Sequence, residues 1–199
     1  MTEAKSPQPS RFWDDFDPNA PFAGADLADL RQGIGQEPGT VASMWRHHRA
    51  AVHDGTFEHG FEDWKLTAEH QTLTLFGLHQ QSHNRTMHQP GIGLGTALRR
   101  LREDTSTSED ALDLQIRALV SSDDTDELYE HLRALITRLS QIGQGTDYSK
   151  LHTDLYYWNW PESRARIQRA WAAQYSNWTL SSASTDDSNK HTHEGEETP

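Results

Sequence analysis

The sequence predicts an all-α protein, a compact bundle of about eight helices. Apolar residues recur three, four and seven positions apart in successive segments, a spacing typical of helices with one buried face. No segment alternates convincingly between apolar and polar residues with a period of two, which would indicate strands. Glycine and proline lie between the apolar segments, where helices are expected to end and begin. No internal repeat of the solenoid type is present.

Four helices are expected in the first half of the chain, within residues 25–35, 37–52, 64–80 and 94–102. Gly33 and Gly35 should end the first helix, and Thr40 should cap the second after the Pro38-Gly39 turn. The residues expected to face inward are Leu27, Leu30, Val41, Met44, Trp45, Ala51, Val52, Trp64, Leu66, Leu73, Phe76, Leu94, Leu98 and Leu101. In the fourth helix this spacing directs Arg99, Arg100 and Arg102 toward solvent.

Four more helices are expected within residues 107–122, 125–142, 147–160 and 161–178. Ser108 followed by two acids is a typical helix start, the next helix should begin at Thr125, and Gly143 should stop it. Pro161 suits the first position of the last helix. The residues expected inside are Leu112, Ile116, Leu119, Val120, Leu128, Leu132, Leu135, Ile136, Leu139, Leu151, Leu155, Trp158, Ile167, Trp171, Tyr175 and Trp178.

The two ends of the chain differ from its middle. Residues 1–10 and the acidic tail 181–199 hold too few apolar groups to offset the entropy of ordering, so both are predicted to be disordered. A helical domain is expected over residues 11–180, divided into two small lobes at about 26–105 and 106–180. Near its start, Phe12, Trp13, Phe16 and Phe22 are too apolar to remain in water and should dock on the body or on a partner.

The net charge of −12 is concentrated at the ends of the chain. Residues 41–180 hold 14 basic and 18 acidic groups, and 12 of the 14 are arginine. The planar guanidinium can bind phosphate through two parallel hydrogen bonds, so this bias favours a polyanion-binding surface over a merely solubilising one. The chain has no cysteine, no signal peptide and no run of about 18 apolar residues that would indicate a membrane span, so a cytoplasmic location without membrane contact is expected.

The sequence offers little support for catalysis or metal binding. His79 and His83 share a helix face and His88 follows, which raises the alternative of a metal site. Their segment, HQQSHNRTMHQPG, supplies no carboxylate and leads into a Pro-Gly loop, so no metal or other cofactor is predicted. The chain has no Gly-x-Ser-x-Gly or Ser-x-x-Lys motif, and GIGLG lacks the strand and spacing of a dinucleotide turn. The protein is therefore not expected to be an enzyme.

Arginine clusters carry the remaining functional signal. They comprise Arg46 with Arg49; Arg99, Arg100 and Arg102; Arg133 with Arg138; and Arg164, Arg166 and Arg169. One interpretation is a groove for a polyanion. The other is that each cluster forms the solvated side of an amphipathic helix and pairs with acids such as Glu103, Glu130 or Glu162. The pattern alone leaves both open.

The order of motifs resembles the CasB-type small subunit of the type I-E CRISPR Cascade complex. The resemblance is carried by LRQGIG…PGTVASMW at 30–45, GIGLGTALRRL at 91–101, LYEHLRALITRL at 128–139, and DYSKLHTDLYYWNWPESRARIQRAWAAQY at 147–175. It implies a non-catalytic helical subunit, present in two copies, that contacts the backbone and large subunits of a crRNA-guided complex. It further implies that basic residues hold nucleic acid of the R-loop, including the displaced strand of the target DNA.

Clusters and resemblance together predict a set of nucleic-acid-binding residues. The set comprises Arg31, Arg99, Arg100, Arg102, Arg133, Arg138, Arg164, Arg166 and Arg169. The helix at 107–122 departs from the family pattern, because DLQIRAL leaves only Arg117 where relatives often carry a basic pair. The alternative function is a purely structural subunit that contacts only protein.

Overall fold

The computed structural model describes residues 10–50, 63–104 and 108–176. Within them lie α1 (Ala23–Gln32), the 3₁₀ helix η1 (Ala42–His47), α3 (Trp64–His79), α4 (Leu94–Glu103), α5 (Glu109–Val120), α6 (Thr125–Gln141), α7 (Tyr148–Tyr157) and α8 (Pro161–Tyr175). This part of the chain contains no strand, only one isolated bridge between His88 and Thr146, which confirms the all-α prediction. Ala51, Val52, Trp178, the tail 181–199 and all of 1–10 except Ser10 lie outside the described residues.

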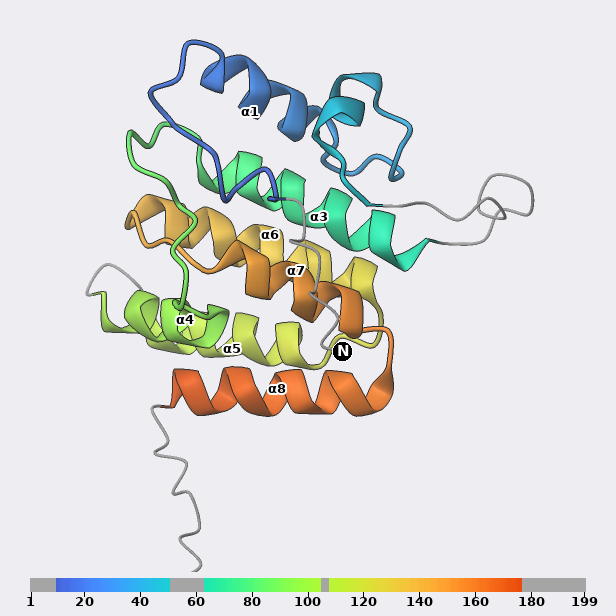
Figure 1. Ribbon diagram of the computed structural model, residues 1–199. Helices are drawn as coiled ribbons and strands as arrows, with labels where there is room; N and C mark the ends of the chain where they lie inside the picture. Colours follow the sequence, from blue (N-terminus) through green and yellow to red (C-terminus); the bar gives the residue numbers. More distant parts are fainter. Residues whose placement is uncertain (1–9, 51–62, 105–107, 177–199) are drawn as a thin grey trace, which may run out of the picture.

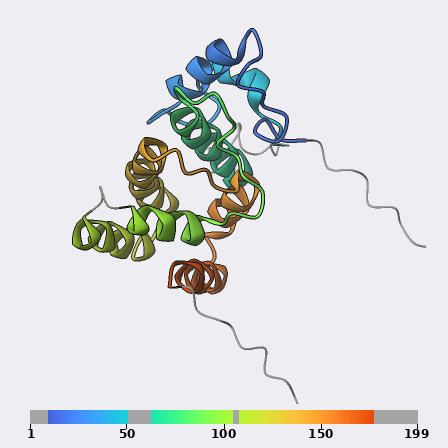
Figure 2. The same cartoon turned by 90° about the vertical axis from the view of Figure 1, so that its left-hand side faces the viewer.

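The helices form successive layers (Figure 1). α1 and η1 lie at one end, α3 comes next, α6 and α7 follow, and α8 lies at the other end beyond α4 and α5. The view turned by 90° shows the same order (Figure 2). α3 packs on α1, α6 and α7, whereas α4 packs on α8 and α6. The division into lobes at residue 105 stays a prediction.

The predicted apolar stripes form one continuous core. Its members include Leu27, Leu30, Met44, Leu73, Phe76, Leu94, Leu98, Leu101, Leu112, Leu119, Leu128, Leu132, Leu135, Ile136, Leu139, Leu151, Leu155, Trp158, Ile167 and Trp171. Ile116 and Tyr175 pack against this core while remaining partly exposed. No helix of the described part is long and apolar enough to cross a membrane.

α3 is buried around almost its whole circumference, including its polar residues. Hydrogen bonds within α3 or to neighbouring helices satisfy several of them: the Thr72 hydroxyl lies 2.6 Å from the Ala68 carbonyl, and the Thr74 hydroxyl 2.8 Å from that of Tyr129. His70 Nδ1, Gln71 Oε1 and His79 Nε2 have no hydrogen-bond partner among the described residues. Burial of polar groups is tolerated when hydrogen bonds replace those made to water. α3 can therefore form the centre of the bundle despite its threonines.

Side-chain caps define the starts of α3, α5, α6 and α7. Ser108 accepts a hydrogen bond from the Ala111 amide, as predicted, and Asp124 caps the helix that begins at Thr125. Asp147 accepts a hydrogen bond from the Lys150 amide at the start of α7. Gly143, predicted to stop α6, follows the end of that helix with φ of 64°, a conformation that favours glycine.

The segment 37–52 differs from its prediction. Val41 is extended and precedes a short 3₁₀ helix, so Thr40 does not cap an α-helix. With three residues per turn, positions 44 and 47 share the inward face. Met44 and His47 are accordingly buried, whereas Trp45 is 62% exposed and donates to the Gly39 carbonyl. The inward assignment of Trp45 was wrong because it assumed α-helical spacing.

The aromatic arm before α1 docks on the body. Trp13 is 1% exposed, and its Nε1 donates to the Ser149 hydroxyl at 2.8 Å. Phe12 and Phe16 meet the Phe76 ring of α3 edge to face, with centroids 5.9 and 5.3 Å apart. Phe22 does not follow them and is 74% exposed. Trp64, predicted to face inward, lies at the surface of α3 with 36% exposure.

Candidate nucleic-acid interface

Leucine anchors fix the outward direction of the α4 arginines. Leu94, Leu98 and Leu101 are at most 3% exposed and hold the helix against α8 and α6. Arg100 and Arg102 consequently lie in solvent, as the sequence predicted, and Arg99 is partly covered with 28% exposure. The helix thus presents three guanidinium groups on its solvated side.

Each α4 arginine has a weak partner within the chain. Arg99 lies 3.8 Å from a Glu103 carboxylate oxygen, and Arg100 donates to the Gln144 side chain at 3.2 Å. Arg102 lies 3.6 Å from Glu109 and 5.6 Å above the centre of the Tyr175 ring. Exposed pairs of this kind contribute about 0–1 kcal/mol. A phosphate can therefore replace these partners at small cost.

Arg133 and Arg138 of α6 do not form one cluster. Five positions of an α-helix turn through about 140° beyond a full turn, so the two side chains leave α6 on different faces. Arg133 bonds Glu130 at 2.9 Å and covers the Tyr129 ring, whereas Arg138 donates to Gln115 of α5. Arg138 therefore links α6 to α5, whereas the contacts of Arg133 lie within α6.

The three arginines of α8 do not lie on one face of the helix either. Arg164 is turned inward, with 18% exposure, and donates to the carbonyl groups of Ser122 and Asp123 in the α5–α6 loop. Arg166 and Arg169 lie on the opposite side of α8, exposed, and neither forms an ion pair within the described residues. Their spacing of three residues places them on one face. These two guanidinium groups are available to a ligand.

Replacing Arg164 with glutamine is expected to lower the free energy of unfolding by about 1.5 kcal/mol, because the partly buried Ser122 carbonyl and the exposed Asp123 carbonyl would lose a charged donor. Urea denaturation of the purified variant measures this change. The matched control is Arg169→Gln, which should stay within about 0.5 kcal/mol of the unsubstituted protein because no ion pair is lost. Equal effects of the two substitutions would contradict the structural role of Arg164.

Arg31 lies far from these clusters. It belongs to the last turn of α1, is partly buried and forms no ion pair within the described part of the chain. α1 and α8 occupy opposite ends of the molecule in both views (Figures 1 and 2). The nine predicted arginines therefore do not form a single patch. α4 packs directly on both α8 and α6, but the two α6 arginines already have partners in Glu130 and Gln115.

Comparison with known proteins assigns the chain to a family. The family model described as CRISPR-associated protein Cse2 matches residues 26–175. The chain belongs to the Cse2 family. Among curated proteins, none matches the sequence.

Three solved structures resemble most of the chain. CasB from Thermobifida fusca is 29% identical, with a TM-score of 0.60 over 78% of this chain and 85% of that one. A Cse2-family protein from Thermus thermophilus is 20% identical, with a TM-score of 0.60 over 83% and 94%. A chain of a CRISPR RNA-guided surveillance complex is 21% identical, with a TM-score of 0.60 over 83% and 87%. The predicted resemblance to the CasB-type subunit is thereby confirmed.

The structure adds one arginine that sequence analysis of this Cse2 chain missed. Arg85 is exposed in the loop between α3 and α4, and its Nη2 donates to the Gly143 carbonyl at 2.6 Å. Arg100 donates to the neighbouring Gln144, so two guanidinium groups bond adjacent residues of the α6–α7 loop. In the sequence, Arg85 is a single arginine in a segment that was considered only for its histidines. That Arg85 and Arg100 bond the same loop was not visible in the sequence.

The histidines considered for a metal site have other partners in this Cse2 fold. His79 Nδ1 lies 2.9 Å from the Tyr148 hydroxyl and His83 Nε2 lies 3.0 Å from that of Ser140. Among the described residues, the one group with converging potential ligand atoms is Asp26, Asp29 and His47. Arg46 already bonds both carboxylates, at 2.7 and 2.6 Å. That group is satisfied as an ion-pair network.

Proposed function

We propose that the chain is a non-catalytic, cytoplasmic subunit of a type I-E CRISPR Cascade complex and stabilises the crRNA-guided R-loop. Its nucleic-acid ligand is the displaced single strand of target DNA. Its protein partners are a second copy of itself and the backbone and large subunits. The observation that carries this proposal is the exposed pair Arg166 and Arg169, which forms no ion pair in the described residues, on a helix that packs against the arginine-bearing α4.

Arginine is suited to binding the displaced strand without reading its sequence. Base pairing with the guide supplies sequence information, so the protein needs only to hold the backbone of the displaced strand. Guanidinium groups bind phosphate without reading bases and gain free energy by releasing counterions. Arg85 and Arg100 add exposed positive charge at the α6–α7 loop, and Arg99 and Arg102 lie on the solvated side of α4.

The overall acidity of the chain suggests that binding occurs in the assembled complex. Each end of the sequence contributes a net charge of about −4, and residues 41–180 contribute a further −4. A free binder of nucleic acid would be repelled at long range by this charge. If neighbouring subunits hold the displaced strand close to α8, this long-range repulsion no longer prevents binding. The short-range contacts between guanidinium groups and phosphates then determine the affinity.

The test compares complexes that carry Arg166→Gln/Arg169→Gln with unsubstituted ones. Loss of two single-strand phosphate contacts should make R-loop binding about tenfold weaker and reduce the slope of log K against log salt by about 1.4. A filter-binding series over salt concentration measures both values. The matched control is Arg49→Gln/Lys65→Gln, which removes the same charge from exposed residues on the η1 and α3 side.

An unchanged affinity and an unchanged salt slope would contradict the strand-binding role of α8. Photo-crosslinking distinguishes the remaining alternative. Adducts between α8 and the displaced strand support the proposal, whereas adducts to protein alone would make the chain a purely structural subunit. The triple variant Arg99→Gln/Arg100→Gln/Arg102→Gln applies the same comparison to α4.

A further inference from the structure

An aromatic cluster formed by Tyr156, Tyr157 and Trp160 lies where α7 ends and α8 begins, at the turn that joins the two helices (Figure 1). Its ring centroids are 4.9, 5.2 and 5.9 Å apart. Tyr156 packs against the core, whereas Tyr157 and Trp160 are each 41% exposed. Contacts among the rings therefore hold Tyr157 and Trp160 in place and still leave part of each ring open to solvent.

The exposed rings are not explained by the needs of the fold. Trp160 occupies the N-cap position of α8, where serine, threonine, aspartate and asparagine are preferred, and it makes no capping hydrogen bond. The buried indoles of Trp158 and Trp171 both donate hydrogen bonds. Within the described part of the chain, the Trp160 indole and the Tyr157 hydroxyl form none. Both side chains thus keep ring surface and a polar group for a ligand.

Positive charge borders the aromatic cluster on both helices. Lys150 and Arg166 are exposed, and neither forms an ion pair within the described residues. Lys150 lies two helical turns before Tyr157, on the same exposed face of α7. Burial raises the pKa of Asp154 to about 6, and the charges of Lys150 and Arg166 act against this rise, so both cations lie near that carboxyl group. Along α8, Arg166 follows Trp160 by about 9 Å.

This combination of groups is suited to single-stranded nucleic acid. Sites that bind such strands combine cationic side chains, which follow the phosphates, with aromatic side chains on which bases stack. An apolar protein surface would cover the rings but would leave the ammonium and guanidinium groups without partners. Glu162 is the only acid between Trp160 and Arg166 in the sequence. The charge around the cluster therefore favours a polyanion over an apolar partner.

We propose that the exposed faces of Tyr157 and Trp160 stack on bases of the displaced strand. The proposal rests on the proposed function, because it takes the displaced strand as the ligand, and it adds the residues that bind the bases to those that bind the phosphates. Every base has a flat face, so stacking requires no particular sequence. This suits a complex in which the guide supplies the sequence information.

The test uses assembled complexes that carry Tyr157→Leu/Trp160→Leu in a filter-binding series over salt concentration. Leucine keeps an apolar side chain but has no ring, so R-loop binding should become about tenfold weaker. The slope of log K against log salt should stay unchanged, because no phosphate contact is lost. Tyr157→Phe/Trp160→Phe keeps the rings and should restore most of the affinity. Circular dichroism of each variant verifies folding.

The matched control is Phe22→Leu. Phe22 is also an exposed aromatic residue at an N-cap without a capping hydrogen bond, but it belongs to α1, at the opposite end of the molecule from α8 (Figures 1 and 2). This substitution should leave the affinity unchanged.

A displaced strand with single abasic sites tests the stacking directly. An abasic site opposite the aromatic cluster should weaken binding by the unsubstituted complex about tenfold and should weaken binding by the leucine variant no further. A strand that carries 5-iodouracil at that position should crosslink to Tyr157 or Trp160. Equal sensitivity of both complexes to every abasic site, or crosslinks from these residues to protein alone, would overturn the proposal.

The salt series separates this proposal from the proposed function. If Arg166→Gln/Arg169→Gln reduced the salt slope but the leucine variant bound as tightly as the unsubstituted complex, stacking would be overturned and phosphate binding would stand. If the leucine variant bound more weakly at an unchanged slope while the arginine variant had no effect, stacking would stand and the assigned phosphate contacts would fail.

Discussion

Replacing Gly95 with alanine is expected to lower the free energy of unfolding by about 3 kcal/mol. Gly95 lies inside α4, where the helix crosses α8, and an added Cβ would stand 2.7 Å from Gln174 Cβ and 3.0 Å from the Trp171 carbonyl carbon. The second neighbour is backbone and cannot move unless α8 shifts. The glycine of the GIGLG motif is therefore required by the close approach of two helices. Urea denaturation followed by circular dichroism measures the loss.

Gly24 provides a matched control for this substitution. It also lies within a helix, α1, but nothing stands within 4 Å of the position of an added Cβ. Alanine at this position should raise stability by about 0.5 kcal/mol, because glycine loses more backbone entropy on folding. If Gly95→Ala and Gly24→Ala had the same effect, the contact of α4 with α8 would not be as close as the structure indicates.

Local periodicity was sufficient to predict much of the fold. The five apolar residues of α6, from Leu128 to Leu139, are all fully buried, as their spacing predicted. The same logic placed Arg100 and Arg102 in solvent, because Leu98 and Leu101 had to face inward. Periodicity succeeds for such helices because one apolar face decides their orientation.

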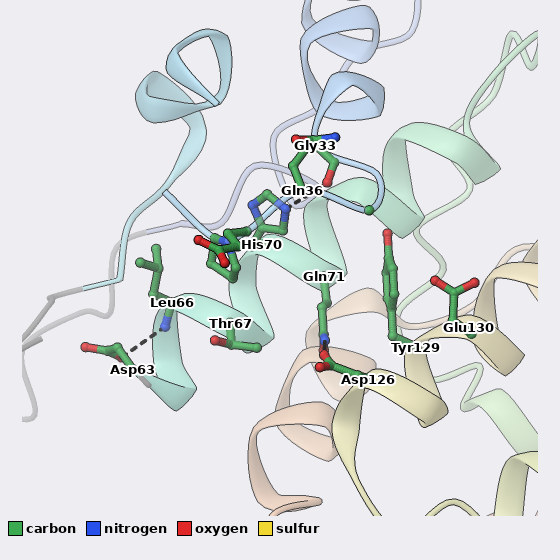
Figure 3. A pocket seen from close by; sticks show the side chains of 13 residues that line it. Gly33, Gln36, Asp63, Leu66, Thr67, His70, Gln71, Asp126, Tyr129 and Glu130 are labelled. Carbon is green, nitrogen blue, oxygen red and sulfur yellow. Dashed lines mark hydrogen bonds between the residues drawn. The ribbon is translucent and has the colours of Figure 1, made fainter. Parts of the chain in front are cut away.

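Contacts between distant segments could not be predicted in this way. Arg164 belongs to a basic cluster by sequence, yet carbonyl groups of the α5–α6 loop turn it inward. Arg85 and Arg100 come from different segments, and both bond the α6–α7 loop only because the fold brings it to them. A pocket of about 570 Å³ likewise combines residues from the loop after α1, from α3 and from α6, so no single stretch of sequence indicates it (Figure 3). Such features depend on tertiary packing, which sequence spacing does not encode.

Acidification from about pH 7.5 to about pH 5 is expected to lower the free energy of unfolding by about 3 kcal/mol. His79 and His152 are buried, and burial lowers the pKa of each from 6.5 to about 3; in His152 the nearby Arg11 charge acts in the same direction. Between pH 6.5 and 3 the unfolded chain binds protons that the folded chain does not, so stability decreases as the pH is lowered. Each histidine should contribute about 2 kcal/mol of this loss at about pH 5.

Asp154 has the opposite effect on the pH dependence of stability. Burial raises its pKa from 3.8 to about 6, although the Trp171 indole, which donates to it at 2.8 Å, opposes the shift. Between these pH values the folded state therefore binds a proton that the unfolded state does not. This raises the free energy of unfolding by about 1.4 kcal/mol as the pH falls to about 5. Burial also lowers the pKa of His47, His48, His70 and His88. Their contributions have the sign of His79.

Urea denaturation at the two pH values measures the net decrease in the free energy of unfolding. The variant His152→Gln isolates the contribution of His152. Glutamine keeps an acceptor for the Arg11 guanidinium, which lies 3.1 Å from His152 Nε2, but it cannot be protonated in this range. The variant should retain only about 1 kcal/mol of pH dependence. If the variant lost as much stability on acidification as the unsubstituted protein, His152 would not be held neutral by burial. The acid sensitivity would then have to arise at His79 and the other buried histidines.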